Sequence, residues 1–327
     1  MSASGGTKAV VAALLANTGI AVTKFIAWAL TGASSMLAES IHSVADAGNQ
    51  GLLLLGGRRA ARPATPEHPF GYGRERYVYA FIVAIVLFSV GGLFALYEAY
   101  HKYEEVHAGQ PNELLDSGWA WLAVTVLLSA IVMEVFSFRT AIVESNHVRG
   151  EASWVEFVRS AKAPELPVVL LEDLAALLGL IFALIGVSMT ILTGNGYWDV
   201  GATAAIGVLL VTVAVVLALE TKSLLLGEGA SPQALGRIRA ALEGDATIER
   251  IIHMKTLHLG PEELLVAAKI GVSRSESAQV VAAAIDAAES RVRAAEPSAR
   301  VIYLEPDIYR DDDRAASRQN LSAPSGH

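Results

Sequence analysis

The sequence predicts an α-helical membrane protein with six transmembrane helices, followed by a small cytoplasmic α+β domain. Of its 327 residues, 53% are hydrophobic and only 18% are charged, and the mean hydropathy is +0.43. An ordinary soluble domain has about 25% charged residues. The apolar stretches occupy residues 1–220, and charges become frequent only beyond Thr221. We therefore expect a six-helix transmembrane domain over 1–220 and a cytoplasmic α+β domain over 221–310.

Six stretches are long enough to cross a bilayer, because about 20 apolar residues span ~30 Å of hydrocarbon. The first is not expected to be a cleaved signal peptide, since it lacks a basic start and a small-residue cleavage site. The predicted spans are residues 8–30, 35–57, 77–100, 117–138, 164–192 and 198–219.

Basic residues are concentrated in two of the connecting segments. Five arginines follow the second stretch and four basic residues follow the fourth, whereas the segment between the third and fourth has only Lys102. Lys and Arg mark cytoplasmic loops. Six spans then place both termini in the cytoplasm, and a bacterial plasma membrane is the simplest compartment.

The predicted second domain has the order α-β-β-α-β. Ser231 is a typical N-cap and Pro232 a typical first helical residue, and a turn is expected at Gly260-Pro261. This order suits a two-layer, ferredoxin-like or metallochaperone-like sandwich. Residues 311–327 are expected to be disordered. The predicted elements are helices over 231–242 and 275–295 and strands over 248–257, 264–272 and 300–304.

Composition limits the chemistry of the protein. Cysteine is absent, which excludes disulfides, thiolate catalysis and cysteine-based metal sites. A metal ion must therefore bind through histidine, carboxylate or amide groups. The formal net charge of −8 argues against nucleic acid as a partner, since that needs a concentrated basic surface, and favours the attraction of cations.

The second stretch carries a polar stripe. Glu39, His42, Asp46 and Asn49 are separated by three, four and three residues, which places them on one face of a helix. A histidine and an aspartate at i, i+4 can chelate one divalent cation. A charge within the membrane costs about 2.5 kcal/mol or more, so such groups face water or each other. The alternative is that His42 and Asp46 only hydrogen-bond each other and a neighbouring helix.

A second half-site is expected on the fifth stretch, because one pair supplies only two ligands and a tetrahedral ion takes four. Asp46 lies 12 residues before the basic Arg58, and Asp173 lies 11 residues after Lys162, so the two carboxylates have a similar depth. Asp173 is the expected ligand. Glu172, rotated by about 100° on the helix, is expected to be a fourth ligand or a proton carrier.

Other intramembrane polar residues allow two interpretations each. Asn17 either lines the pathway or forms an interhelical hydrogen bond. Lys24 either snorkels or pairs with a carboxylate. Glu39 is expected beside the metal ligands rather than among them, and Glu134 and Glu220 are interpreted as interfacial.

At these residues the chain resembles the cation diffusion facilitator family of divalent-metal/proton antiporters. The resemblance rests on the run from Ser35 to Asp46, on the loop from His68 to Arg74, on the six spans and on the α-β-β-α-β end, and it covers about residues 8–310. It implies that His42 and Asp46 form one half of a transport site. It also implies a homodimer with one site in each protomer.

For the second half of that site, the resemblance implies Asp173. Many family members have a His or Asp four residues earlier, where this chain has Val169, and the neighbouring Glu172 resembles a branch with a Glu-Asp pair. Two histidines with two aspartates would favour zinc, whereas one histidine with carboxylates can also admit Mn²⁺, Fe²⁺ or Co²⁺. Zn²⁺ is the expected substrate, with these three as alternatives.

The resemblance also bears on the loop and the tail. His68 matches a loop histidine that binds metal in the family, and the alternative is that this loop only satisfies the rule of basic cytoplasmic loops. Several tail residues lie where relatives bind regulatory zinc, and the alternative role of the tail is dimerisation. These residues are His253, His258, Glu263, Glu305 and Asp307.

Together these features predict proton-coupled efflux of a divalent cation rather than catalysis. Protons act as the counter-substrate, because metal ligands must be deprotonated to bind. The chain has no GxxxxGK[ST] loop for ATP. Two rivals are an intramembrane metal-dependent hydrolase, for which the usual HExxH motif is missing, and a passive channel, which is usually lined by rings of repeated groups.

Overall fold

The computed structural model describes residues 18–116, 119–244 and 246–309, which form two units. The helical unit comprises Met1–Arg59 and Glu75–Lys222, and the sheet unit comprises Ala60–Arg74 and Ser223–His327. The predicted tail over 311–327 and the first part of the first predicted span lie outside the described residues.

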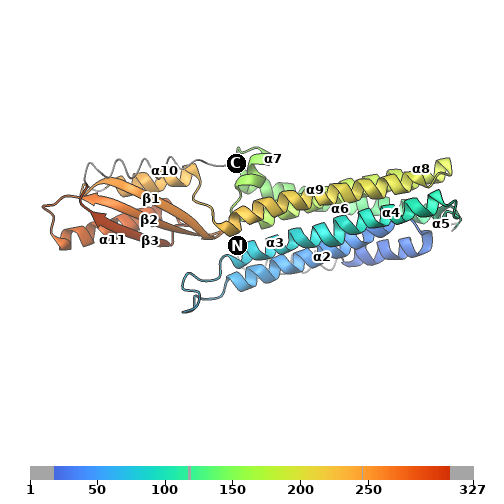
Figure 1. Cartoon of the computed structure of the whole chain (residues 1–327). Coiled ribbons are helices and arrows are strands. Elements are labelled where there is room, and N and C mark those ends of the chain that lie inside the picture. Colours follow the sequence, from blue (N-terminus) through green and yellow to red (C-terminus); the bar gives the residue numbers. More distant parts are fainter. Residues whose placement is uncertain (1–17, 117–118, 245, 310–327) are drawn as a thin grey trace. The chain divides into compact units, whose positions relative to one another are not determined.

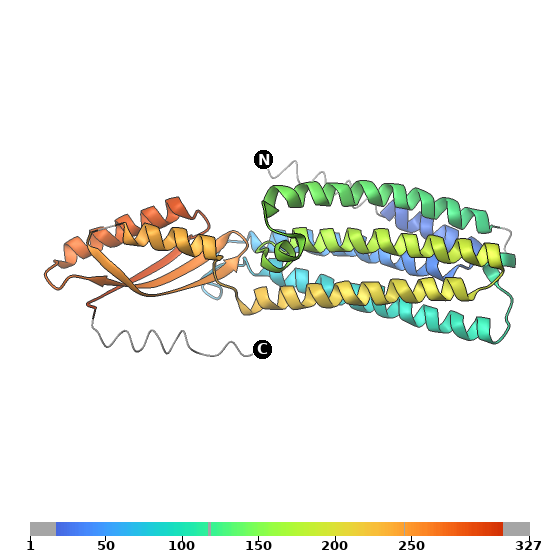
Figure 2. The ribbon, with the colours of Figure 1, turned by 90° about the horizontal axis from the view of Figure 1, so that it is seen from above.

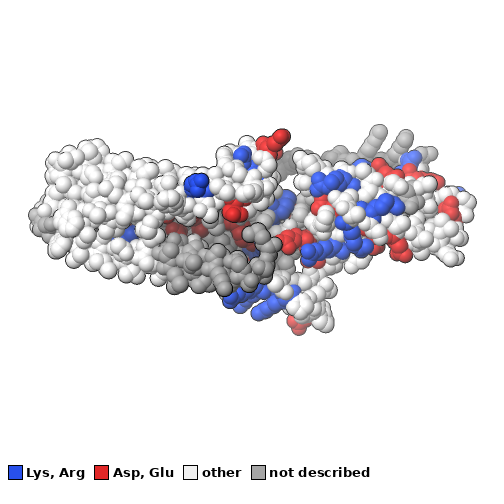
Figure 3. Space-filling model, turned by 180° about the vertical axis from the view of Figure 1, so that it is seen from behind, with Lys and Arg blue, Asp and Glu red and all other residues white. Residues whose placement is uncertain are grey.

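The helical unit contains four helices that are long and apolar enough to cross a membrane (Figure 1). On the face drawn in Figure 3, this unit has few charged side chains. The four are a continuous helix over Glu75–His107, made of α3 (Glu75–Val86), the π-helical η1 (Leu87–Leu93) and α4 (Phe94–His107), then α6 (Ala120–Arg149), α8 (Glu165–Thr193) and α9 (Tyr197–Leu226). The prediction of a helical membrane-spanning region is confirmed.

Two further helices occupy the region of the first two predicted spans. One covers Thr18–Thr31 and is shorter than the four. The other, α2 (Ser34–Ala60), has 27 residues, which is long enough to cross at 1.5 Å per residue. Its polar stripe lowers its hydropathy, so α2 is not among the four.

The helices extend beyond the apolar stretches that predicted them. Helix α6 continues to Arg149, eleven residues past the predicted end, and the short helices α5 (Glu113–Asp116) and α7 (Trp154–Ser160) lie in predicted loops. The side chain of Ser153 starts α7 by accepting a hydrogen bond from the Glu156 amide at 3.2 Å. Hydropathy marks where a chain meets hydrocarbon, whereas backbone hydrogen bonds and caps decide where its helix ends.

Glycines bring the Glu75–His107 helix and α9 close together. A Cβ atom on Gly92 would lie 2.7 Å from Val211 Cγ2, and one on Gly207 would lie 2.7 Å from Leu96 Cγ. Small residues allow such close contact between membrane helices, where dispersion contacts and not the hydrophobic effect hold the helices together.

The sheet unit has the predicted order α-β-β-α-β. Strand β1 is antiparallel to β2, and β2 is parallel to β3, in the order β1-β2-β3. Its two helices pack together on one face of the sheet (Figure 2). The elements are α10 (Pro232–Glu243), β1 (Ile248–Gly260), β2 (Glu263–Val272), α11 (Ala278–Ala295) and β3 (Val301–Asp307).

Serine caps and alternating apolar residues explain these elements. Ser231 and Ser277 accept hydrogen bonds from the amides of Ala234 and Val280 at 3.2 and 3.3 Å. In β2, every second residue from Leu264 to Ile270 is buried against the helices. A small sheet domain at the C-terminal end is therefore confirmed.

Candidate metal site

Helix α2, which carries the predicted ligands, is fixed at its N-terminus by Asp199 of α9. The backbone amides of Ser34 and Ser35 donate to the Asp199 carboxylate at 2.9 and 3.3 Å, and the Ser35 hydroxyl donates to it as well. A carboxylate at this position satisfies free amides and the positive end of the helix dipole. The contact fixes the position of the first turn of α2 against α9.

His42 and Asp46 are adjacent on α2, as their spacing predicts. His42 is fully buried, and its Nδ1 lies 3.4 Å from Asp46 Oδ1. Neither ring nitrogen of His42 has a hydrogen-bond partner among the described residues. A buried imidazole without partners is costly, unless its nitrogens bind something else.

A small cavity lies beside Asp46, with a volume of about 20 Å³. This is enough for one water molecule or a bare ion. Four carboxylates from three helices line it: Asp46 of α2, Glu134 of α6, and Glu172 and Asp173 of α8. The remaining lining residues are Ile20, Ser43, Gln50 and Val169.

Hydrogen bonds from neighbouring helices position both acidic residues of α8. Asn49 Nδ2 donates to Glu172 Oε1 at 2.6 Å, and the Ser137 hydroxyl donates to Asp173 Oδ2 at 2.9 Å. Although the two side chains leave the helix in different directions, both reach the same cavity. Asn49, the last polar residue of the stripe, thereby connects α2 to α8.

Glu134 is a residue that the sequence-based interpretation placed elsewhere. Its position five residues before Arg139 suggested the membrane interface, yet its side chain lines the cavity with Asp46. Glu134 and Ser137 are three residues apart on α6, so they share a face. This polar i, i+3 pair on an apolar helix is the signal that could have indicated the contact.

Glu39 does not line the cavity. Its Oε2 lies 3.1 Å from Lys24 Nζ, and both side chains are buried. Lys24 also donates to the Ser43 hydroxyl at 2.7 Å. Lys24 therefore pairs with a carboxylate and does not snorkel, and its hydrogen bond to Ser43 connects this pair to the cavity wall.

Three of the predicted ligands, Asp46, Glu172 and Asp173, line one cavity, whereas His42 is not among its lining residues. Among residues 18–116, 119–244 and 246–309, no three His, Asp or Glu side chains are arranged to hold a metal ion. Asn17 lies outside these residues. The structure thus brings Asp46, Glu172, Asp173 and Glu134 together at the cavity. His42 lies next to this group, beside Asp46 on α2.

The loop histidine and the tail residues belong to the sheet unit and are not among the residues that line this cavity. His68 is exposed and stacks on Tyr72, with ring centroids 4.6 Å apart. His258 is buried near the end of β1, with Nδ1 3.3 Å from the Gly260 carbonyl, and Glu263 begins β2.

On the sheet, a lysine lies between the remaining predicted tail ligands. Lys269 pairs in register with His253 on one side and Glu305 on the other. Its ammonium lies 2.8 Å from Asp307 and 3.3 Å from Glu305. Hydrogen bonds to Asp307 and Glu305 raise the pKa of Lys269. The positively charged Lys269 ammonium therefore lies beside the two carboxylates that a metal ion would need at this part of the sheet.

Membrane-length helices with carboxylates around a small cavity, followed by a small sheet domain, are the arrangement that a membrane transporter for cations requires. The chain matches the cation efflux transmembrane domain over residues 10–226. It therefore belongs to the cation diffusion facilitator family. Members of this family are cation efflux transporters and not enzymes, in agreement with the class that the sequence predicts.

Curated relatives cover most of the chain. It is 33% identical to the mitochondrial proton-coupled zinc antiporter SLC30A9 of Mus musculus over 259 residues, which is 78% of this chain and 44% of that protein. It is 26% identical to metal tolerance protein C4 of Arabidopsis thaliana over 265 residues, 80% of this chain and 56% of the relative. A shorter match, 23% identical over 133 residues, is to the magnetosome protein MamM of Paramagnetospirillum magneticum, with 41% of this chain and 40% of MamM covered.

These comparisons correct the predicted compartment. The SLC30A9 proteins of mouse and human, each 33% identical to this chain, are mitochondrial proteins of eukaryotes. They point to a mitochondrial membrane, so the prediction of a bacterial plasma membrane is wrong. The concentration of arginines identified one side of a membrane, but charge counts carry no information about which membrane it is.

Proposed function

We propose that this chain exchanges a divalent transition-metal ion, Zn²⁺, for protons at the cavity between α2, α6 and α8. His42, Asp46 and Asp173 are the principal ligands, with Glu172 and Glu134 completing the set. The observation that carries the proposal is the cavity itself, in which Asp46, Glu172 and Asp173 line one small space.

Electrostatics supports a cation in this space. Four carboxylates around about 20 Å³ repel one another strongly if all are charged. Either protons or a divalent cation must relieve this repulsion, and the two compete for the same oxygens. This competition is the basis of antiport: binding protons releases the metal, and losing them allows the metal to bind again.

The identity of the metal is proposed on two grounds. The SLC30A9 relatives are named as zinc antiporters, and His42 supplies the nitrogen ligand that zinc favours. A single histidine among carboxylates also suits Mn²⁺, Fe²⁺ or Co²⁺. Val169 lines the cavity where a further nitrogen or oxygen ligand would otherwise stand, which is why these three metals are the second candidates.

We also propose six membrane crossings, with the helix over Thr18–Thr31 and α2 joining the four apolar helices. Both termini then lie on the side of the arginine-rich segments, in a mitochondrial membrane. Residues 1–220 form the transport domain and 221–310 the second domain, which serves in homodimerisation, each protomer having its own site.

The test is metal flux into proteoliposomes with and without an imposed pH gradient, using Zn²⁺, Mn²⁺, Fe²⁺ and Co²⁺ in parallel. Antiport is supported if the pH gradient drives metal flux in the parent protein, and the metal that moves is then the substrate. This flux should be lost in Asp46→Ala and kept in Glu144→Gln. Glu144 is an exposed residue of α6, so it controls for loss of a carboxylate elsewhere. Equal flux in Asp46→Ala contradicts the site, and flux independent of the gradient contradicts antiport.

A further inference from the structure

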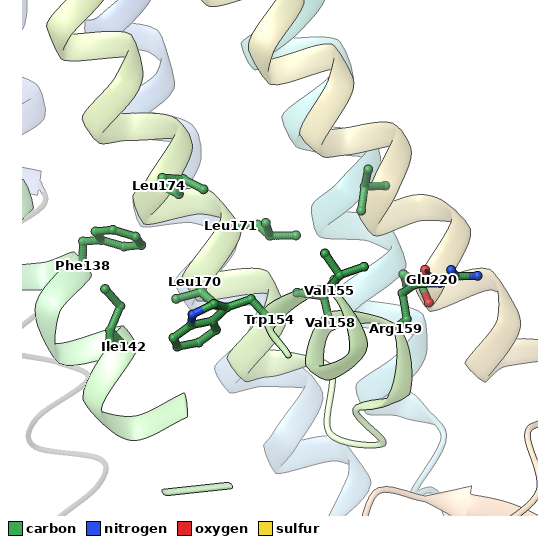
Figure 4. A pocket seen from close by; sticks show the side chains of 11 residues that line it. Phe138, Ile142, Trp154, Val155, Val158, Arg159, Leu170, Leu171, Leu174 and Glu220 are labelled. Carbon is green, nitrogen blue, oxygen red and sulfur yellow. Dashed lines mark ion pairs between the residues drawn. The ribbon is translucent and has the colours of Figure 1, made fainter. Parts of the chain in front are cut away.

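A second, larger cavity lies in the helical unit between α6, α7, α8 and α9 (Figure 4). Its volume is about 650 Å³, within the ~300–1,000 Å³ typical of ligand pockets. Its walls are almost entirely apolar and include Phe138, Ile142, Trp154, Leu170 and Leu174. It shares no lining residue with the metal cavity, so the transport cycle does not account for it.

Helix α7, which forms one wall, has the character of a helix at a membrane surface. Trp154, Val155 and Val158 supply apolar side chains to the cavity, whereas Glu156 and Arg159 are polar. Val155 is also 68% exposed. A tryptophan and an exposed valine on a short amphipathic helix beside membrane helices suit contact with lipid.

One guanidinium group lines this apolar space, and a second lies against the side chain of one of its wall residues. Arg159 lines the cavity, and its side chain is 74% exposed. The Arg149 guanidinium lies 4.3 Å from the centroid of the Trp154 ring. Arginine binds phosphate through paired hydrogen bonds and loses less hydration energy than lysine.

The ion pair that Arg159 forms within the protein is weak. Its Nε lies 3.8 Å from Glu220 Oε1, and an exposed ion pair of this length contributes little. A phosphate can therefore compete for Arg159, while an acyl chain fills the apolar space below it. The cavity therefore combines an apolar space of about 650 Å³ with an exposed arginine on its wall.

We propose that this cavity binds an anionic phospholipid of the surrounding bilayer, with an acyl chain between α6 and α8 and its phosphate at Arg159. Arg159 and Glu220 line the cavity, and Arg149 lies over the ring of the wall residue Trp154, so the charged groups around it include two arginines and one glutamate. This excess of positive charge favours an anionic headgroup over a zwitterionic one. The lipid would hold α7 against α6, α8 and α9.

The test uses the purified full chain in a neutral detergent, with phosphatidylglycerol or phosphatidylcholine added. Bound lipid per protein is measured by native mass spectrometry, and thermal unfolding is followed in parallel. The parent protein is expected to retain phosphatidylglycerol preferentially and to unfold at a higher temperature with it. Removing one cation near an anionic headgroup weakens binding about fivefold, the loss expected for Arg159→Gln.

Matched variants separate this cavity from general lipid contact. Ile142→Trp fills the cavity and should lose the bound lipid, whereas Val143→Trp, on an exposed neighbour, should keep it. Arg139→Gln, an exposed arginine of the same helix, should also behave like the parent. Arg159 is exposed, so its variant folds even if Ile142→Trp does not.

Three results overturn the proposal. One is equal retention of the two lipids, which indicates a non-selective lipid annulus. Another is unchanged retention in both Arg159→Gln and Ile142→Trp. The third is that Ile142→Trp halves the molecular mass of the particle and leaves lipid retention unchanged. The cavity would then be filled by a second copy of the chain, which the tryptophan displaces.

Discussion

Lys24 Nζ lies 3.1 Å from Glu39 Oε2, and the two side chains are 3% and 0% exposed. The pair joins the helix over Thr18–Thr31 to α2, one turn before His42. An isolated charge at this depth is costly, and each group removes that cost for the other. The positive charge of Lys24 also lies near the cavity, because Lys24 donates to Ser43.

Replacing Lys24 alone should destabilise the protein more than replacing both members of the pair. Lys24→Met leaves Glu39 buried without its partner, and losing one member of a buried pair costs about 3–5 kcal/mol. Lys24→Met with Glu39→Gln removes both charges and should recover part of that stability. Thermal unfolding of the four proteins of this double-mutant cycle in detergent checks the coupling; additive effects would show that the pair is not coupled.

Glu134→Gln should weaken metal binding. The variant removes one carboxylate from the cavity wall but keeps the shape of the side chain, and losing a partner of metal ligands typically costs about 10–100-fold in affinity. Titration of Zn²⁺ at constant pH measures the change. Glu144→Gln on the same helix is the control, and an affinity equal to that of the parent would place Glu134 outside the binding set.

Asp199→Asn should lower the unfolding temperature. The amide cannot accept from Ser34 and Ser35 with the full charge of the carboxylate, and losing a helix cap costs about 0.5–2 kcal/mol. Thermal unfolding is compared with that of Glu104→Gln, which alters an exposed carboxylate near the end of α4. If the two variants unfold alike, the Asp199 cap contributes no stability to α2.

Acid should weaken the sheet unit through Glu296. Burial alone raises the pKa of this carboxyl, but hydrogen bonds from Ser298 and Arg237 outweigh it and hold the pKa below its ordinary value. A lowered folded-state pKa contributes stability above the unfolded value of about 4.3, and this contribution is lost as pH falls through the folded value. The hydrogen-exchange protection factors of α10 and α11 in the full chain, which correct for the intrinsic pH dependence of exchange, should therefore decrease below about pH 4.3.

The variant Glu296→Gln gives the matching control for this pH effect. The glutamine side chain cannot titrate, so the protection factors of α10 and α11 in this variant should depend less steeply on pH than those of the parent. An identical pH dependence in both proteins would assign the acid effect to other carboxyls of the unit.

Much of the architecture follows from local patterns in the sequence. Apolar stretches predicted the membrane helices, Ser231 and Pro232 predicted the start of α10, and the three-four-three spacing placed Glu39, His42, Asp46 and Asn49 on one stripe. These predictions succeed because helix periodicity and capping depend on residues a few positions apart. The predicted helix ends were less accurate, since α6 continues through polar residues to Arg149.

Only the tertiary structure decided which side chains meet. The sequence determined that ionisable groups lie within the membrane helices. It did not determine that Glu134 lines the cavity with Asp46 or that Asn49 donates to Glu172. It also did not determine that Glu39 pairs with Lys24 instead of lining the cavity. Nor could it place Lys269 between His253 and Glu305. Such contacts depend on the rotation and register of elements far apart in the chain, and these are set by packing over whole helix and sheet surfaces.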